Sequence, residues 1–248
     1  MAKERTLYKK PEALTDNIFS YCWGCGHSTV HKIIAEIVDE LKIREKVIGI
    51  APVGCAVFAY DFWNFDVTEA AHGRAPVVAT AIKRVRPDKV VFAYQGDGDL
   101  ASIGMAETIH TANRGENISV IFINNTNYGM TGGQLAPTTL IEQVTTTSPN
   151  GRDIKNHGYP IRMIELLAPL EGVKYLERVK VTDAASIIKA KKAIKKAFVN
   201  QISNVGFSMV EVLSGCPANW RKDPIESNRM IDETISEYYA LGKIKDVV

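Results

Sequence analysis

Val90 to Thr139 reads VVFAYQGDGDLASIGMAETIHTANRGENISVIFINNTNYGMTGGQLAPTT. The stretch begins with a short apolar run, Val90 to Tyr94, and contains a second such run from Ile118 to Ile123. Between them, Leu100 to Arg114 has a helical pattern and is followed by Gly115, a frequent residue at helix C-termini. A strand, a helix and a strand of these lengths form a βαβ unit, which implies a parallel sheet. We therefore predict an α/β fold, an open and mostly parallel sheet with helices on both faces.

Polar residues follow both of these strands. Asp97 comes directly after the first strand, and Asn125 follows 28 residues later at the end of the second. Ligands of open parallel sheets bind beyond the carboxyl ends of the strands, and Mg²⁺ prefers oxygen ligands. Asp97, Asn125 and a backbone carbonyl near Asn127 can supply them, while Gly98 and the loop Gly129–Gly133 let the main chain approach a phosphate. Gly-Asp-Gly alone is also ordinary turn chemistry, so the asparagine spacing is what favours a magnesium–diphosphate site.

The chain contains four cysteines: Cys22, Cys25, Cys55 and Cys216. The first two form a C-x-x-C pair just before a helix predicted to start at Ser28. Each of the other two follows a predicted strand, Val47 to Pro52 and Phe207 to Leu213. A parallel sheet would bring all four thiols to one edge. Four thiolates suit either zinc or an iron–sulfur cluster, and the spacing alone does not separate these metals or exclude reduced cysteines without a metal.

Two histidines lie near the start of the same helix. His31 shares the apolar face of the helix, so we expect it to pack in the core. His27 abuts the helix N-terminus, where anions are favoured, and it could face a phosphate or form a local cap. His72 opens a further helix that runs to about Val85 and ends before Pro87.

The composition is that of an ordinary globular protein, with 248 residues, 46% hydrophobic and 23% charged. We expect one domain with an N-terminal arm, about residues 1–17, and a C-terminal helical extension, about residues 224–248. A net charge of +2 argues against a dedicated nucleic-acid binder. The polar start lacks a signal peptide, and no apolar run approaches the roughly 18 residues of a membrane helix, so we expect a cytoplasmic protein without a membrane partner.

The Gly-Asp-Gly and Asn-Asn pattern resembles the fingerprint of thiamine-diphosphate enzymes. The fuller pattern, HGRAP-x-VATAIK-x-x-x-PD, QGDGDLASIG and NN-x-x-YGMTGGQ-x-x-PTT, is similar to the β subunit of 2-oxoacid:ferredoxin oxidoreductases and extends over Tyr21 to Asn219. The resemblance implies a thiamine-diphosphate domain of the PP type in which Asp97, Asn125 and the carbonyl of Asn127 hold Mg²⁺. It also implies one 4Fe–4S cluster held by Cys22, Cys25, Cys55 and Cys216. The residues that it implies along thiamine diphosphate are Val53, Gly54, Cys55, Ala56, His27, His72, Gly98, Asp99, Gly129, Met130 and Thr131.

This family carries out the coenzyme A-dependent oxidative decarboxylation of a 2-oxoacid to acyl-CoA and CO₂, with electrons passing through the cluster to ferredoxin. The resemblance places 2-oxoglutarate narrowly ahead of a branched-chain 2-oxoacid such as 2-oxoisovalerate. We assign no catalytic residue to this chain, because the glutamate that activates thiamine is expected on an α subunit with a pyrimidine-binding domain. Gamma and small ferredoxin-like subunits are further expected partners.

Two other functions remain open, and one helix has two possible roles. A non-oxidative thiamine-diphosphate decarboxylase or synthase subunit would retain Asp97 and Asn125 but would not need four gathered cysteines. A zinc-stabilised nucleotide-binding regulatory module would explain the thiols but not the Asp-to-Asn spacing. A lysine-rich helix, Ala184 to Asn200, is most simply a solvated face, although it could dock an acidic ferredoxin.

Overall fold

A seven-stranded sheet forms the centre of the computed structural model, which describes residues 9–247. Its strand order is β2-β1-β3-β4-β8-β7-β9. The strands are β1 Val47–Ala51, β2 Asp66–Glu69, β3 Val90–Gly96, β4 Ser119–Asn124, β7 Val173–Lys180, β8 Phe207–Leu213 and β9 Gly242–Asp246. All neighbouring strands run parallel except β9, which pairs antiparallel with β7. The prediction of a mostly parallel sheet is confirmed.

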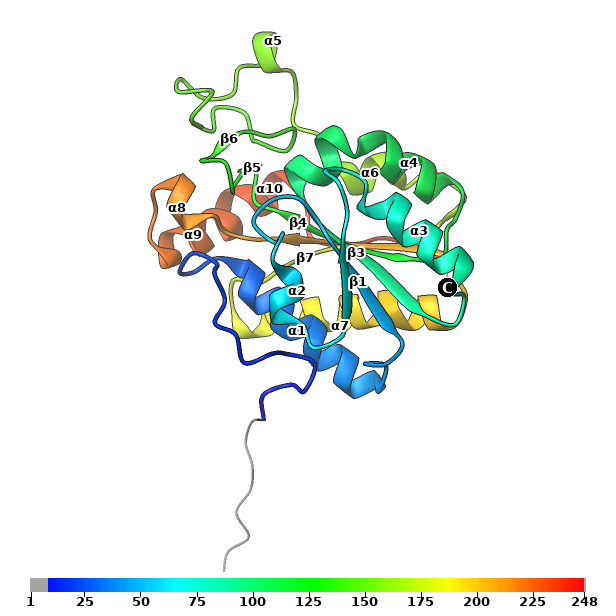
Figure 1. The fold of residues 1–248 in the computed structure, drawn as a ribbon. Coiled ribbons are helices and arrows are strands. Elements are labelled where there is room, and N and C mark those ends of the chain that lie inside the picture. The colour runs from blue at the N-terminus through cyan, green and yellow to red at the C-terminus, as the bar shows by residue number, and fades with distance from the viewer. Residues whose placement is uncertain (1–8, 248) are drawn as a thin grey trace, which may run out of the picture.

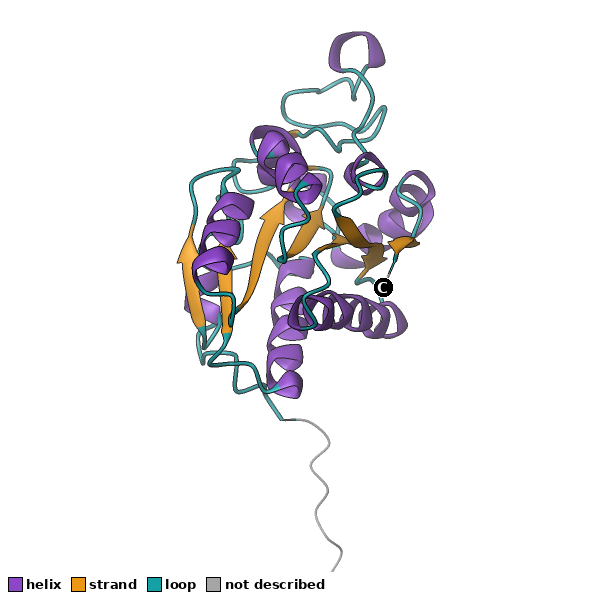
Figure 2. Ribbon diagram, turned by 90° about the vertical axis from the view of Figure 1, so that its right-hand side faces the viewer, coloured by secondary structure: helices purple, strands orange, loops and turns teal. Residues whose placement is uncertain are grey.

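Helices cover both faces of this sheet (Figures 1 and 2). Apolar side chains of α1 (Gly26–Leu41) and α7 (Ala184–Ile202) pack on one face, and those of α3 (Ala75–Val85), α4 (Met105–Asn113) and α6 (Met163–Leu167) pack on the other. The shorter elements are α2 Ala59–Phe62, α5 Ile154–His157, α8 Pro217–Trp220, α9 Pro224–Met230, α10 Ser236–Tyr238, the π-helical turns η1 Asp99–Ile103 and η2 Ile231–Ile235, and the hairpin strands β5 Asn127–Tyr128 and β6 Gln134–Leu135. The loops between β5 and α6, which include α5, extend away from the sheet in both views.

The sequence explains why these elements form. Strands β3, β4 and β8 are apolar runs that are buried along almost their whole length, as expected for strands covered on both faces. Helix α1 repeats apolar residues at a spacing of three and four, which gives it one buried face. Helix α7 begins with a capping box in which Asp183 accepts hydrogen bonds from two backbone N–H groups and Ser186 bonds back to Asp183.

Several boundaries differ from the predictions. Helix α1 begins at Gly26 with Cys25 in the N-cap position, so Ser28 is not the cap. The helix expected over residues 100–114 is divided at Gly104 into η1 and α4. Strands β2 and β9 were not predicted, and the C-terminal extension is helical only as far as Tyr238, because β9 completes the sheet edge beside β7.

The predicted N-terminal arm is described from Lys9 onward, and its first eight residues lie outside the described range. The backbone N–H groups of Glu12 and Ala13 donate hydrogen bonds to the Asp39 carboxylate at 2.6 and 3.1 Å, so the arm is attached to the end of α1. Within residues 9–247, none of the helices has both the length and the hydropathy needed to cross a membrane.

Candidate functional site

Parallel pairing brings the carboxyl ends of β1, β3, β4 and β8 to the same edge of the sheet. A cavity of about 120 Å³ opens there between the loops that leave β1, β3 and β4. Every residue predicted to bind thiamine diphosphate or Mg²⁺ lines this cavity, together with Pro52, Gly96 and Tyr128. The side chains that sequence analysis placed far apart along the chain therefore surround one space.

Asp97 is buried at the base of this cavity with its carboxylate held by three donors. Oδ1 accepts the backbone N–H of Gly98 at 2.9 Å, and Oδ2 accepts the N–H of Asn127 at 3.1 Å and the hydroxyl of Thr138 at 2.7 Å. Burial nevertheless raises the pKa of Asp97 to about 7, and the three hydrogen bonds offset only part of that effect. A cation at this carboxylate would favour its ionised form.

Asn125 presents an oxygen that the protein itself does not use. Its Oδ1 is buried and has no hydrogen-bond partner within residues 9–247. A buried polar atom without a partner is costly unless a ligand or ion satisfies it. The preceding and following residues hold the turn: Asn124 Oδ1 accepts the N–H of Thr126 at 3.1 Å, and Thr126 adopts a left-handed φ of 58°. Asp97 and Asn125 thus form an oxygen donor set of the kind that Mg²⁺ prefers.

At two glycines the cavity directly contacts the main chain. A Cβ built on Gly54 or Gly96 would have no other atom within 4 Å, so at these two positions the cavity comes directly up to the main chain. At Gly98, in contrast, a Cβ would lie 2.2 Å from the ring of Tyr128, which packs against the backbone there. A diphosphate group could approach the main chain at Gly54 and Gly96 without displacing a side chain.

The cavity also contains two histidines, each with a ring nitrogen close to a neighbouring side chain. His72 Nδ1 lies 2.8 Å from Asp99 Oδ1, and Asp99 Oδ2 accepts a hydrogen bond from Gln95 at 2.5 Å. The Asp99 carboxylate is therefore engaged by protein groups, although the residue lines the cavity. His27 Nδ1 lies 2.7 Å from the Tyr94 hydroxyl, and burial lowers the pKa of His27 to about 4, so its ring is neutral at physiological pH.

These contacts exclude one of the two roles considered for His27, the local cap, and leave its phosphate-facing role a prediction. Its side chain bonds to Tyr94 on β3 and not to the first turn of α1, so it does not cap the helix. His31 is fully buried among aromatic rings, with Trp63 at 4.2 Å between ring centroids, and packs in the core as predicted.

All four cysteines line a second cavity, of about 260 Å³, beside the first. They are free thiols, and burial raises the pKa of Cys25 and of Cys55 to about 12. A Cβ on Gly129 would lie 3.0 Å from Cys55 Sγ and 3.7 Å from Cys216 Sγ, so a glycine there leaves the space between the two thiols open. In residues 9–247, no three His, Cys, Asp or Glu side chains are arranged to hold a single metal ion.

The two cavities share a wall. Cys55, Asn125, Gly129 and Met130 line both of them. Tyr21 lines the cysteine cavity and stacks on His27, which lines the other, with 4.9 Å between ring centroids. A group bound in one cavity would therefore lie close to a group bound in the other.

Sequence analysis missed several residues that shape the site. Thr138 donates to Asp97, Gln95 holds Asp99, and Asn219 donates to the carbonyl of Gly129 at 2.8 Å and to Cys216 Sγ at 3.3 Å. Thr138 and Gln95 belong to the sequence motifs quoted above, but nothing in their local pattern indicates which side chain they contact.

The chain is similar to known proteins of one kind. Residues 53–212 match the family model described as the thiamine pyrophosphate enzyme, C-terminal TPP binding domain. The ketoisovalerate oxidoreductase subunit VorA of Methanothermobacter marburgensis is 51% identical over 226 residues, which are 91% of this chain and 47% of that protein. The counterpart in Methanothermobacter thermautotrophicus is 47% identical, over 98% of this chain and 53% of that protein. The chain thus spans about half the length of these ketoisovalerate relatives.

Two further likenesses cover more of the matching protein. The 2-oxoglutarate synthase subunit KorB of Methanocaldococcus jannaschii is 35% identical, over 92% of this chain and 81% of that protein. Among solved structures, the 2-oxoglutarate:ferredoxin oxidoreductase from Magnetococcus marinus, with 2-oxoglutarate, coenzyme A and succinyl-CoA bound, matches with a TM-score of 0.76 and 28% identity. That match covers 87% of this chain and 70% of the other.

Proposed function

The chain belongs to the thiamine-diphosphate-binding subunits of the 2-oxoacid:ferredoxin oxidoreductases, and on that premise we propose that it is the β subunit of an enzyme that oxidatively decarboxylates a 2-oxoacid. The products would be an acyl-CoA and CO₂, with electrons leaving through an iron–sulfur cluster to ferredoxin. The observation that carries the proposal is the shared wall between a cavity lined by Asp97 and Asn125 and a cavity lined by four cysteines.

We place 2-oxoisovalerate or a similar branched-chain acid first among the substrates. The sequence by itself puts 2-oxoglutarate narrowly ahead, but the two ketoisovalerate relatives are 47–51% identical to this chain, whereas the 2-oxoglutarate relative from Methanocaldococcus is 35% identical. The higher identity to the ketoisovalerate relatives favours the branched-chain acid, and 2-oxoglutarate remains the second candidate.

In this proposal the residues of the first cavity hold the cofactor. Asp97, Asn125 Oδ1 and the backbone carbonyl of Asn127 would bind Mg²⁺, and the glycine-lined main chain at Gly54 and Gly96 would lie along the diphosphate. Bound thiamine diphosphate supplies a carbon nucleophile and an electron sink for decarboxylation. Neutral His27 and the Asp99-oriented His72 would line the reacting end of the cavity, where each can present a ring nitrogen in a defined orientation.

The cysteine cavity supports a cluster better than a single zinc ion. Zinc requires all of its thiolates within about 2.3 Å of one point, which would bring the sulfurs into close mutual contact. Here the four thiols are among the residues that line a cavity of about 260 Å³, which has room for a larger polynuclear group. This arrangement also argues against the non-oxidative thiamine enzyme, which has no use for a thiol-lined cavity beside its cofactor.

Anaerobic purification with iron and zinc analysis and electron paramagnetic resonance of the reduced chain tests the cluster. We expect about four irons per chain, the iron content of the proposed 4Fe–4S cluster. Gly129→Ala, which adds a methyl group between Cys55 and Cys216, should lose most of this iron. Gly96→Ala, whose methyl group enters the other cavity, is the matched control and should retain it. One zinc per chain, or no iron, would contradict the proposed cluster, and equal iron in both variants would contradict its placement beside Gly129.

The substrate is tested on the chain assembled with its partner subunit. We expect coenzyme A-dependent reduction of a viologen dye with 2-oxoisovalerate to exceed that with 2-oxoglutarate at equal concentration. The reverse order would restore 2-oxoglutarate as the first candidate, and no reduction with any 2-oxoacid would remove the proposed reaction.

A further inference from the structure

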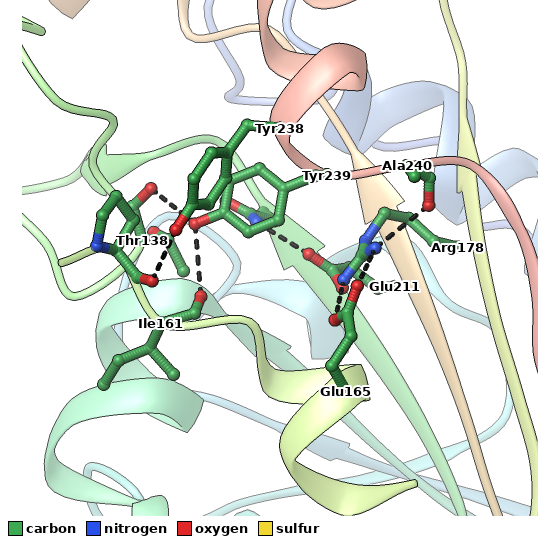
Figure 3. Close-up of polar contacts among 10 residues, drawn as sticks. Thr138, Ile161, Glu165, Arg178, Glu211, Tyr238, Tyr239 and Ala240 are labelled. Carbon is green, nitrogen blue, oxygen red and sulfur yellow. Dashed lines mark hydrogen bonds and ion pairs between the residues drawn. The ribbon is translucent and has the colours of Figure 1, made fainter.

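A buried polar network connects the C-terminal segment with Thr138, in the loop after β6 (Figure 3). The Tyr239 hydroxyl donates to the carbonyl of Thr138 at 2.7 Å and to that of Ile161 at 3.2 Å. Thr138 in turn donates its own hydroxyl to Asp97 Oδ2 at 2.7 Å. Tyr239 and Thr138 are both fully buried, so water does not compete for these hydrogen bonds. One residue of the C-terminal segment thus holds the residue that orients Asp97.

A second branch of the network runs from Ala240, the residue after Tyr239, to the turn after β4. The Arg178 guanidinium donates to the carbonyl of Ala240 at 3.0 Å and, through Nε, to Glu211 Oε2 at 2.8 Å. Glu211 Oε1 accepts a hydrogen bond from the side chain of Asn124 at 2.7 Å. Asn124 then holds the N–H of Thr126, the residue that follows Asn125 and has a left-handed backbone. This branch therefore ends on the turn that presents Asn125.

The two branches meet above the sheet. The guanidinium of Arg178 lies 5.3 Å from the centroid of the Tyr239 ring. It also donates two hydrogen bonds, of 2.8 and 2.6 Å, to the Glu165 carboxylate. Arg178 and Glu211 have fully buried side chains. A buried ion pair contributes little net stability compared with apolar residues of the same volume, so its clearest benefit is a defined orientation.

We propose that Tyr239 and Arg178 are positioning residues that set the geometry of the Mg²⁺ site by holding Asp97 and the Asn125 turn from one anchor in the C-terminal segment. This inference rests on the proposed Mg²⁺–diphosphate site. Mg²⁺ demands a nearly ideal octahedron at 2.0–2.1 Å, whereas Ca²⁺ accepts flexible coordination at longer distances. A network that fixes two ligands relative to each other therefore matters more for Mg²⁺ than for Ca²⁺.

The test compares Tyr239→Phe with Tyr238→Phe in the full chain. Tyr238 is the adjacent residue and also donates its hydroxyl to a carbonyl, that of Pro160 at 3.0 Å, but this bond leads to neither ligand. Mg²⁺ and Ca²⁺ are each titrated at saturating thiamine diphosphate, and binding is measured by calorimetry. Tyr239→Phe should weaken Mg²⁺ binding about three- to tenfold, the effect of one buried hydrogen bond, and Ca²⁺ binding by less than about twofold. Tyr238→Phe should change neither affinity.

A second pair of variants tests the same path from its other end. Thr138→Val removes the hydroxyl that donates to Asp97, and Thr138→Ser keeps it. We expect the valine variant to lower the preference for Mg²⁺ over Ca²⁺ and the serine variant to restore it. Because Tyr239 acts through Thr138, the double variant Tyr239→Phe with Thr138→Val should lose little more Mg²⁺ affinity than Thr138→Val alone.

The outcomes separate this inference from the proposed function. If the unaltered chain does not bind thiamine diphosphate with Mg²⁺, the proposed function fails. If the unaltered chain binds both, and Tyr239→Phe either matches Tyr238→Phe or weakens Mg²⁺ and Ca²⁺ equally, the positioning role fails while the proposed function stands. If Tyr239→Phe does not fold, the valine and serine variants at Thr138 decide the question by the same ratio of affinities.

Discussion

The environment of Asp97 favours a bound cation. Three donors orient its carboxylate, and yet burial raises its pKa to about 7. Hydrogen bonds from neutral groups offset only part of the cost of burying a charge, whereas a divalent cation would offset much more. Asn125 Oδ1, which is buried and has no hydrogen-bond partner within residues 9–247, could accept a cation or a donor beside Asp97.

Asp97→Asn should change how the stability of the metal-free chain depends on pH. Burial raises the folded-state pKa of Asp97 from its ordinary value near 4 to about 7, so its proton stabilises the folded chain below about pH 4, and this stabilisation is lost as the pH rises to about 7. Asp97→Asn lacks this loss. Urea denaturation at pH 4 to 8 should therefore show the variant gaining stability relative to the unaltered chain up to pH 7, with no further gain above it.

Two controls accompany that measurement. Asp66→Asn replaces an exposed aspartate on β2 and should leave the pH profile unchanged. Addition of Mg²⁺ with thiamine diphosphate should stabilise the unaltered chain above pH 7 and should not stabilise Asp97→Asn. A difference in stability between Asp97→Asn and the unaltered chain that is constant from pH 4 to 8 would contradict the raised pKa of Asp97.

One ion pair between strands β7 and β8 is buried, whereas the charged side chains of helix α7 lie at the surface. The side chains of Arg178 on β7 and Glu211 on β8 are wholly buried. Burial alone would lower the pKa of Arg178, but Glu165 and Glu211 hold it above its ordinary value. The lysines of α7 are at the surface instead. Lys191 and Lys195 pair with acidic residues of α1 at partly exposed positions, where such pairs contribute at most about 1 kcal/mol.

Arg178→Met should therefore be strongly destabilising. It leaves Glu211 buried without its cation, and breaking a buried pair in this way typically costs about 3–5 kcal/mol of the free energy of unfolding. The double variant Arg178→Met with Glu211→Gln removes both charges and should recover most of that loss. Denaturant unfolding at pH 7 measures both. A loss below about 1 kcal/mol in the single variant, similar to that of a surface pair, would contradict the assignment.

At the scale of the whole molecule, the acidic side chains that line the cofactor cavity bear on which groups the proposed reaction can draw from this chain. Among residues 9–247, the cavity is lined by two acidic side chains, Asp97 and Asp99, and no glutamate. Asp99 is engaged by His72 and Gln95, and Asp97 is the proposed Mg²⁺ ligand. As the family resemblance implies, we expect the carboxylate that activates thiamine to come from a partner chain.

We expect that the isolated chain binds thiamine diphosphate with Mg²⁺ but does not oxidise a 2-oxoacid. Coenzyme A-dependent dye reduction should be at background with the chain alone and should appear when the partner subunit is added. The binding measurement is the control, because it shows that the chain is folded and loaded. Robust turnover by the chain alone would place the missing carboxylate within this sequence.

Much of this site could be predicted from sequence because the residues proposed as its main ligands follow strands directly. Asp97, Asn125, Cys55 and Cys216 each come at or just after the carboxyl end of a strand, and an apolar run makes such a strand visible in the sequence. Parallel pairing then brings them to one edge without further information. The resemblance to a known family added the identity of the cofactors and the residues expected along them.

Contacts between distant segments were decided only by the tertiary structure. Thr138 lies 41 residues from Asp97, and Tyr239 lies 101 residues from Thr138, so no local periodicity links them. Strand β9 is short and carries lysines, and it becomes a strand because β7 offers it an unpaired edge. The sequence by itself therefore determined which residues reach the edge of the sheet. The packing of the C-terminal segment decided how those residues are held, because a side chain's orientation depends on neighbours that only the folded chain supplies.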